Sequence, residues 1–483
     1  MDAAHDYTSS APLALRRGRD LLARESLPIV VSSAFVALLT VLVPRLLSSD
    51  GWLALVVGRL IARDGLPHHD TLAALTAGRT WVDQQWLGQL AIYGIERAGG
   101  IRLVLAVNVA CVVGAFVAAA ALARRRGGEP STVAGVGLLL LLPYLVSAMN
   151  VRTQSFAYLP FVALVPLLGT RGKVNARRVA LVLVLLAVWA NVHGSVLLAA
   201  GVVALRGATV LGQRHGGRGT GLTLLIAPWL CVFVSPYHVH LLAYYADTVF
   251  NRSFSTYLSQ WAPTSFSAIS APLLVLLFAV PWLLGRVRRS YSAYEQVLLG
   301  LAAVVGLLAV RNWPFAALLI LVLTPAGLDA ALRKRRSRPA PAVGAVIAAV
   351  VAIAALVGLV HTLSRPGSSL HKAYAPAAAQ AAARAAAATH GRVYAGITFA
   401  DWLLWADPEL TRRVVFDVRY ELLHASEVKR VVLFDNGSGV DQPLGRPTVF
   451  VLDPIAEKQA VRGLGADVRV VYKTDEALVA RVR

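Results

Sequence analysis

The feature that most constrains this chain is a series of apolar segments that recurs from residue 29 to residue 363. A membrane-spanning helix needs about 20 predominantly apolar residues. Segments such as 29–47, 131–149 and 341–363 meet this requirement. Because 57% of the residues are hydrophobic and only 15% are charged, a soluble globular protein is excluded. The sequence therefore predicts a polytopic α-helical membrane protein.

Short basic clusters separate the apolar segments and predict the orientation of the chain. The net charge is +21, but the basic residues lie between apolar runs and not on a soluble module, so we expect no nucleic-acid partner. Placing the clusters in the cytoplasm gives about 11 crossings. Residues 1–28 are then a cytoplasmic segment, 29–363 the transmembrane domain, and 48–100 a large first outer loop. The interruption at 191–194 predicts a tight turn between two crossings.

The composition changes after about residue 364, where alanine-rich and β-like stretches replace the long apolar runs. Residues 375–389 have high helix propensity, and His390-Gly391 is a suitable C-terminal cap. Five short runs are rich in β-branched or aromatic residues and predict strands. They are 392–397, 413–418, 430–435, 448–453 and 468–472. The sequence therefore predicts a small extracytoplasmic α/β domain over residues 364–483.

An aspartate, Asp50, directly follows the first apolar segment. At this position a carboxylate can reach a substrate whose tail stays in the bilayer, and it can accept a proton or hold a divalent cation such as Mg or Mn. Ser48-Ser49-Asp50 equally suits a helix N-terminus, where the same carboxylate is only a cap. The following residues, Asp50 to Arg63, have apolar side chains at helical spacing and predict a helix lying on the membrane surface.

Further acidic and histidine residues occur in the same loop. His68, His69 and Asp70 are adjacent, but neighbouring side chains point in different directions and a third ligand at suitable spacing is missing, so a turn after Pro67 competes with a metal site. Asp83 lies just before a tryptophan of the kind that marks a membrane interface.

Polar side chains also occur where later apolar runs break. Asn191 and His193 lie inside an apolar run, where unpaired polar groups are costly, so we expect them to line a cavity or an outer turn. Arg152 and Arg311 are predicted at outer helix ends, where a guanidinium suits a phosphate or pyrophosphate, although it can also anchor the helix by snorkelling. An aromatic loop suits either stacking on sugar rings or an interfacial belt. It contains Tyr237, His238, Tyr244, Tyr245, Gln260 and Trp261.

Several short motifs resemble those of the GT-C class of integral-membrane glycosyltransferases, especially bacterial relatives of the oligosaccharyltransferase and protein-mannosyltransferase groups. In the membrane region the resembling features are the aspartate after the first crossing, GLPHHDTLAALTAGRTWVDQQWL, RTQSF at 152–156, WANVHGS at 189–195, SPYH at 235–238 and RNWPF at 311–315. In the C-terminal region they are GRVYAGITFADWLLW and VVFDVRYELL, with Asp417 and Arg419.

This resemblance implies inverting transfer of a sugar from a polyprenyl-phosphate donor to a glycan, lipid or protein acceptor at the outer face of a bacterial plasma membrane. By the same resemblance, Asp50 is the general base or a metal ligand, and Arg311 with Arg152 stabilises the leaving phosphate. The implied acceptor side is formed by His68, His69, Asp70 and Asp83, and the substrate-binding set also includes Asn191, His193 and Tyr237.

Two other classes of function remain open from the sequence. One is a non-catalytic envelope protein of the same fold that binds a glycan or a partner through its outer domain. The other is a lipid or solute transporter, for which the sequence offers neither inverted repeats nor a pair of broken helices.

Overall fold

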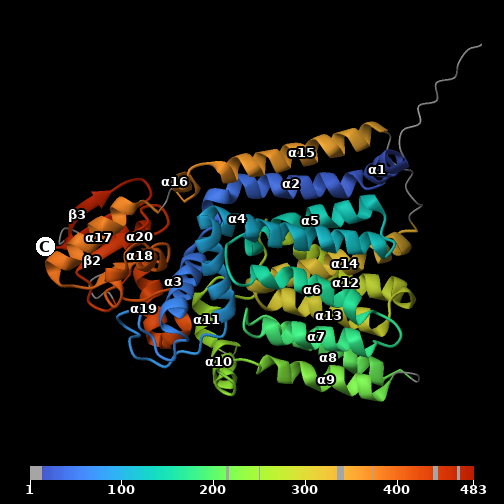
Figure 1. The fold of residues 1–483 in the computed structure, drawn as a ribbon, viewed down its shortest axis with the longest axis horizontal. Helices are drawn as coiled ribbons and strands as arrows, with labels where there is room; N and C mark the ends of the chain where they lie inside the picture. The colour runs from blue at the N-terminus through green and yellow to red at the C-terminus, as the bar shows by residue number, and fades with distance from the viewer. Residues whose placement is uncertain are drawn as a thin grey trace, which may run out of the picture.

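A computed structural model describes residues 13–213, 217–249, 251–333, 342–371, 374–438, 444–464 and 468–483. The predicted cytoplasmic segment 1–28 is thus described only from residue 13, and the predicted last crossing, 341–363, only from residue 342. Figure 1 shows a bundle of long helices with a small α/β domain at one end.

The bundle helices fall on the predicted apolar segments, except that α4 begins at Trp86, inside the predicted outer loop 48–100, and its helical backbone is interrupted at Gly99 and Gly100. They are α2 (Ser26–Leu42), α4 (Trp86–Arg125), α5 (Pro130–Ala148), α6 (Ser155–Leu168), α7 (Ala176–Trp189), α8 (Val196–Leu211), α9 (Arg218–Val232), α12 (Ala271–Val287), α13 (Ala293–Leu308), α14 (Trp313–Ala331) and α15 (Ala342–Ser364). Among the described residues, 6 helices are long and apolar enough to cross a membrane. The chain is therefore a multi-pass helical membrane protein, and the count of about 11 crossings stays a prediction.

Short helices connect or extend the bundle. They are α1 (Leu13–Arg24), α10 (His240–Val249), α11 (Arg252–Tyr257) and the 3-10 turns η1 (Val43–Arg45), η2 (Arg288–Ser290) and η3 (Val310–Asn312). Helix α14 is the most enclosed, whereas α15 packs against α2 at the edge of the bundle and leaves most of its surface exposed (Figure 1). The predicted tight turn is confirmed, because α7 ends at Trp189 and α8 begins at Val196.

Helix α3 (Ser49–Asp64) corrects the prediction of a helix lying on the membrane surface. Its first half is buried on every side, because it packs between α4 and α18 (Ala400–Ala406). Gly58 permits the close approach to α4, since a Cβ there would lie 2.5 Å from the carbonyl oxygen of Gln89. On the other side, Arg59 donates to the carbonyl oxygens of Leu404 and Trp405. The apolar spacing therefore reflects packing against protein.

The C-terminal domain contains a mixed four-stranded sheet in the order β1-β2-β4-β3. Strands β1 (Val393–Ala395) and β2 (Val449–Leu452) pair in parallel, and β4 (Leu478–Val482) pairs antiparallel with β2 and with β3 (Val468–Lys473). The remaining elements are α16 (Gly367–Leu370), α17 (Pro376–Thr389), α18, η4 (Pro408–Leu410), η5 (Tyr420–Leu422), α19 (Ala425–Asp435) and α20 (Lys458–Gly463). The alanine-rich helix is confirmed, and it ends at His390 in the left-handed conformation, with φ of 48°.

Two of the five predicted strands are wrong. Residues 430–435 belong to helix α19, because Val428, Val431 and Phe434 are spaced to bury one helical face and Glu427 closes a capping box at its start. Residues 413–418 contribute only an isolated bridge between Val414 and Val393. The predicted strands at 392–397, 448–453 and 468–472 coincide with β1, β2 and β3, whereas β4 was not predicted.

The first outer loop joins the two parts of the molecule. After α3 the chain packs along the C-terminal domain, where the amides of Ala74 and Leu75 donate to the carbonyl oxygens of Val414 and Val415 at 2.7 and 3.0 Å. The amide of Arg412 donates in return to the carbonyl oxygen of Leu72. The loop and the domain therefore form a continuous surface over one end of the bundle.

Candidate functional site

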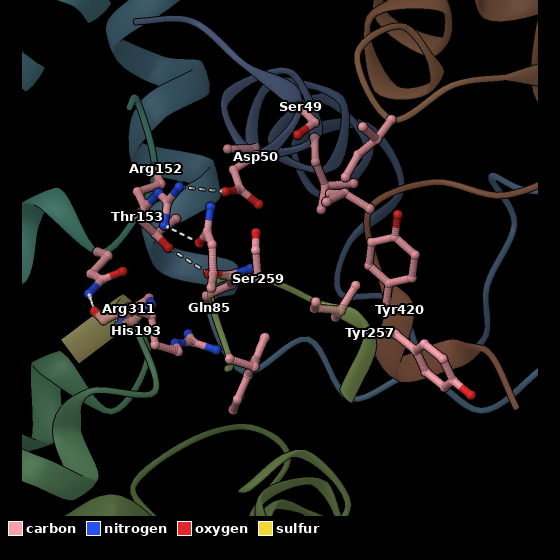
Figure 2. A pocket seen from close by; sticks show the side chains of 18 of the residues that line it. Ser49, Asp50, Gln85, Arg152, Thr153, His193, Tyr257, Ser259, Arg311 and Tyr420 are labelled. Atoms are coloured by element: carbon pink, nitrogen blue, oxygen red, sulfur yellow. Dashed lines mark hydrogen bonds and ion pairs between the residues drawn. The ribbon is translucent and has the colours of Figure 1, made fainter. Parts of the chain in front are cut away.

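A cavity of about 410 Å³ lies where the end of the bundle meets the C-terminal domain (Figure 2). This volume falls within the range of small-molecule sites. The bundle and its loops supply most of the wall, and the domain supplies the rest. Its lining includes Ser49, Asp50, Gln85, Arg152, Thr153, His193, Tyr257, Gln260, Trp261, Arg311, Tyr420 and Asp435. Four of the ten predicted site residues, Asp50, Arg152, His193 and Arg311, therefore meet in one pocket.

The carboxylate of Asp50 is fixed at the pocket by the start of α3. The helix begins at Ser49, so Asp50 lies in its first turn, where the helix dipole favours a negative charge. Its Oδ2 lies 3.1 Å from a terminal guanidinium nitrogen of Arg152, and its side chain stays 36% exposed. The helix start was correctly predicted, and the same carboxylate also remains accessible from the pocket.

Arg152 is held between two elements of the pocket wall. One terminal nitrogen pairs with Asp50, and the other donates to Oε1 of Gln260 at 3.0 Å. Its buried Nε has no hydrogen-bond partner among the described residues. A buried donor of this kind is costly unless an acceptor binds there. This nitrogen is enclosed by protein, so a ligand in the cavity meets the charge of Arg152 and not this donor.

Arg311 enters the same pocket from η3, at the start of α14. Its guanidinium carbon lies 3.8 Å from the ring centroid of Trp261, and its backbone amide donates to the carbonyl oxygen of Gln260. In the described parts of the chain it forms no ion pair with a carboxylate. Stacking orients the guanidinium while leaving its donors free for a phosphate.

His193 occupies the turn between α7 and α8 and is buried. Its Nδ1 accepts a hydrogen bond from the backbone amide of Ser195 at 3.0 Å. Because a backbone amide can only donate, Nδ1 is unprotonated and Nε2 carries the proton. Burial, with Arg311 and Arg152 nearby, holds the pKa of His193 well below its ordinary value. The imidazole is therefore neutral and offers one N–H donor.

The C-terminal domain supplies a wall that the sequence did not predict. Figure 2 shows Tyr420 of this domain, beside Tyr257 of α11, across the pocket from Arg152. Asp435, at the end of α19, also lines the cavity and accepts a hydrogen bond from the hydroxyl of Tyr394 at 3.0 Å. Burial raises the pKa of Asp435 to about 6. Only a contact across the fold brings this wall to Asp50, so neither motif nor spacing indicated it.

Asp70 lies away from this pocket and holds the first outer loop against the C-terminal domain. Its Oδ1 lies 2.7 Å from Arg419, and its Oδ2 accepts from the hydroxyl of Thr76 at 2.5 Å. Burial alone would raise the pKa of this carboxyl, but Arg419 and Thr76 bring it below its usual range. His69 bridges to Thr80 in the same loop. The proposed turn after Pro67 is thus a short paired segment.

His68 and Tyr237 form a second contact outside the pocket. The hydroxyl of Tyr237 donates to the carbonyl oxygen of Pro67 at 2.7 Å, and its ring meets the edge of His68 with centroids 5.8 Å apart. In the aromatic loop, Gln260 and Trp261 reach the pocket lining, whereas Tyr237, Tyr244 and Tyr245 do not belong to it.

Asp83 and Asn191 are buried beside the pocket without lining it. The side-chain oxygen of Asn191 accepts from Nε1 of Trp86 at 2.8 Å, and its amide donates to the carbonyl oxygens of Ala187 and Val234. Burial raises the pKa of Asp83 to about 7. Asn191 therefore joins three segments of backbone. The acceptor assignment of His68, His69, Asp70 and Asp83 stays a prediction.

A divalent cation at Asp50 stays a prediction. Such ions need several oxygen or nitrogen ligands that converge. In the part of the chain that the structure describes, no group of three His, Cys, Asp or Glu side chains is placed to hold a metal ion. A guanidinium also occupies the immediate neighbourhood of Asp50. A cation here would be held by Asp50 together with a phosphate of the substrate, because Mg²⁺ is usually bound by one or two carboxylates plus substrate phosphates.

Comparisons with known proteins show structural similarity without sequence matches. No protein-family model and no curated protein matches the sequence. The structure is similar to the archaeal oligosaccharyltransferase AglB from Archaeoglobus fulgidus, in complex with an inhibitory peptide and a dolichol-phosphate. The sequence identity is 11% and the TM-score is 0.48, and the match covers 88% of this chain and 69% of the AglB chain. It is also similar to ArnT from Cupriavidus metallidurans in the apo state, with 15% identity, a TM-score of 0.43 and coverage of 92% and 97%.

A second ArnT structure, bound to undecaprenyl phosphate, is similar with 16% identity, a TM-score of 0.39 and the same coverage. The structural matches include an oligosaccharyltransferase, one of the groups that the motifs resemble, at an identity of 11%.

Proposed function

We propose that the chain is a membrane glycosyltransferase that moves a sugar from a polyprenyl-phosphate donor to an acceptor at the outer membrane face. The observation that supports this proposal is the meeting of one accessible carboxylate and two guanidiniums in a single cavity at the end of the bundle. A lipid-linked donor keeps its chain in the bilayer and brings its phosphate and sugar to that end. Asp50, Arg152 and Arg311 would then face the headgroup.

In the proposed reaction, Asp50 acts as the general base. An acceptor hydroxyl gives its proton to the Asp50 carboxylate while its oxygen forms a bond to the anomeric carbon. The bond between that carbon and the phosphate oxygen breaks, and the electron pair leaves with the polyprenyl phosphate. Attack opposite the leaving group inverts the anomeric configuration.

The cationic side of the pocket would stabilise the leaving group. Charge grows on the phosphate as the bond breaks, and donors fixed in advance act most strongly there. Arg311 is oriented by Trp261, Arg152 is held by Asp50 and Gln260, and His193 offers the Nε2 proton. Tyr420 and Asp435 stand on the other wall and would contact the acceptor or the sugar hydroxyls.

The proposal includes an orientation with the N-terminus in the cytoplasm, about 11 crossings, and the C-terminal domain outside the plasma membrane. The chain has two cysteines, Cys111 and Cys231, which alanine can replace. We then expect a cysteine at exposed Ser255 to react with an impermeant maleimide on intact cells, and one at exposed Lys173 to react only after lysis. Labelling of Lys173→Cys on intact cells would contradict the orientation.

Turnover tests the role of Asp50. Purified protein in liposomes is supplied with a panel of labelled polyprenyl-phosphate sugars and membrane extract as acceptor, and released polyprenyl phosphate is measured. We expect Asp50→Asn to reduce turnover by about 10²- to 10⁴-fold, the usual contribution of a positioned base. Asp64→Asn is the matched control, because it changes an exposed carboxylate at the far end of the same helix. Full turnover in Asp50→Asn would refute the mechanism.

A non-catalytic glycan-binding protein is the second candidate, because the aromatic side chains of Tyr257, Trp261 and Tyr420 line the same cavity. Aromatic rings stack on sugars without any base. This alternative predicts that Asp50→Asn leaves glycan binding intact and that no donor in the panel is consumed by the unchanged protein.

A further inference from the structure

A second cavity runs along one side of the bundle, from Leu21 in α1 to Leu363, next to the end of α15. Helices α1, α2, α4 and α15 enclose about 820 Å³, and the lining is almost entirely apolar. Figure 1 shows α2 and α15 side by side, with α1 at their far end. Val117 and Leu356 in its wall are 41% and 59% exposed, so the cavity opens toward the hydrocarbon that surrounds a membrane protein. It is an apolar groove and not a closed core.

The dimensions of this groove suit an acyl chain. Its wall on α2 runs from Glu25 to Val36, about 16 Å at 1.5 Å per residue. On α4 it runs from Ala106 to Arg125, about 28 Å by the same rise. One leaflet contributes about half of the roughly 30 Å hydrocarbon core. The groove along α4 is therefore about as long as the whole core, and a lipid of the leaflet at the α1 end can lay one chain along the half next to α1.

Three consecutive arginines stand at the polar end of the groove, and they differ in their partners. Arg124 pairs with Glu25 at 2.7 Å, and Arg126 pairs with Glu295. Arg125 lies between them, is exposed, and forms no ion pair with any of the residues described in the structure. Only Arg124 and Arg125 of the three line the groove. The mouth therefore carries one uncompensated positive charge.

We propose that this groove binds one anionic phospholipid, with a chain between α4 and α15 and its phosphate at Arg125. The apolar wall supplies the affinity for the chain, and the guanidinium supplies the preference for a negatively charged headgroup. The site is separate from the pocket at Asp50, so the proposal holds whether or not the chain transfers sugars.

Glycine positions allow the groove to be filled without disturbing the bundle. A Cβ at Gly114, which lines the groove, would meet no atom within 4 Å. The same is true at Gly135, which lies on α5 outside the groove. Gly114→Leu therefore fills the site, and Gly135→Leu is the matched control at an equally open helical position. Arg125→Gln tests the headgroup, with Arg178→Gln as an exposed control outside the groove.

The experiment uses the full chain in nanodiscs of phosphatidylcholine with or without phosphatidylglycerol. Native mass spectrometry after release counts the retained lipids. We expect the unchanged protein and both controls to retain phosphatidylglycerol in preference to phosphatidylcholine. Gly114→Leu should lose this lipid, and Arg125→Gln should lose about fivefold in the preference, as expected for one surface arginine.

Three results would overturn the proposal. Equal retention of the two phospholipids by the unchanged protein would remove the headgroup preference. Unchanged retention by Gly114→Leu, confirmed as monodisperse, would place the lipid elsewhere. Displacement of phosphatidylglycerol by equimolar undecaprenyl phosphate would assign the groove to a polyprenyl lipid. None of these measurements depends on turnover of a sugar donor. A failure of the proposed sugar transfer is therefore distinguishable from a failure of the lipid-binding proposal.

Discussion

Replacing Arg419 by methionine should release the first outer loop from the C-terminal domain. The guanidinium lies 2.7 Å from Asp70 and also pairs with both oxygens of Asp417. The three side chains are at most 3% exposed, and the guanidinium carbon lies 4.2 Å from the ring centroid of Trp81. Methionine keeps the apolar stem but leaves two buried carboxylates without their cation.

The expected cost follows from that burial. Removing one partner of a buried ion pair destabilises a protein by about 3–5 kcal/mol, because the remaining charge stays desolvated. Two carboxylates lose their partner here, so Arg419→Met should cost more than Asp70→Asn, which leaves the pair with Asp417 in place. If the loop opens locally, this cost appears as faster amide exchange in the loop and not as global unfolding.

Hydrogen exchange measured by mass spectrometry provides the assay. The amides of Ala74 and Leu75 donate across the interface to Val414 and Val415, so their peptide reports opening directly. A loss of about 3–5 kcal/mol corresponds to exchange roughly 10² to 10³·⁵ times faster. Arg63→Met is the control, because that arginine is 73% exposed and its ion pair among the described residues is with its neighbour Asp64. Equal protection in Arg419→Met and this control would refute the reasoning.

Two further predictions concern packing and titration. Gly58→Ala should lower the thermal midpoint in detergent, because overpacking against Gln89 costs about 1–3 kcal/mol. Gly94→Ala is the control and should raise the midpoint, because its Cβ would meet nothing within 4 Å and the change removes a helical glycine. Equal shifts of the midpoint in the two variants would disprove the close approach at Gly58. Burial raises the pKa of Glu457 from 4.5 to about 8, so ionising it opposes folding and stability falls as the pH rises through this interval. Glu457→Gln should therefore match the unchanged protein near pH 4 and exceed it near pH 9 in denaturant titrations, and a pH-independent difference would contradict this.

The sequence predicted those parts of the fold and site that depend on local pattern or on membrane topology. Hydropathy marked the bundle segments, and the break at 191–194 marked a turn. Asp50, Arg152, His193 and Arg311 were predicted at outer helix ends, and a bundle of antiparallel crossings brings such ends together. For these residues the membrane topology alone predicts proximity, because it determines which helix ends lie on the same side of the bilayer.

Other features depend on partners far along the chain, which a pattern cannot supply. Asp70 is held by Arg419, 349 residues later, so its position in a loop beside two histidines suggested a ligand where the fold has an ion pair. Helix α3 has the same apolar spacing whether it faces lipid or protein, and α18 decides the matter. Residues 430–435 read as a strand by composition, yet the helical face of Val428, Val431 and Phe434 is what the domain core buries.

The ion pair that closes the loop also shapes the candidate site. Asp417 and Arg419 turn their side chains toward Asp70, whereas the intervening Val418 and the following Tyr420 line the pocket. Alternate residues of this segment thus form the ion pairs that hold the loop and the wall of the pocket. Removing the ion pairs of Arg419 must therefore also disturb the pocket wall opposite Arg152. Exchange and turnover should change together in Arg419→Met. Asp50→Asn should lower turnover with exchange unchanged, because the ion pair of Asp50 among the described residues is with Arg152 and not with Arg419.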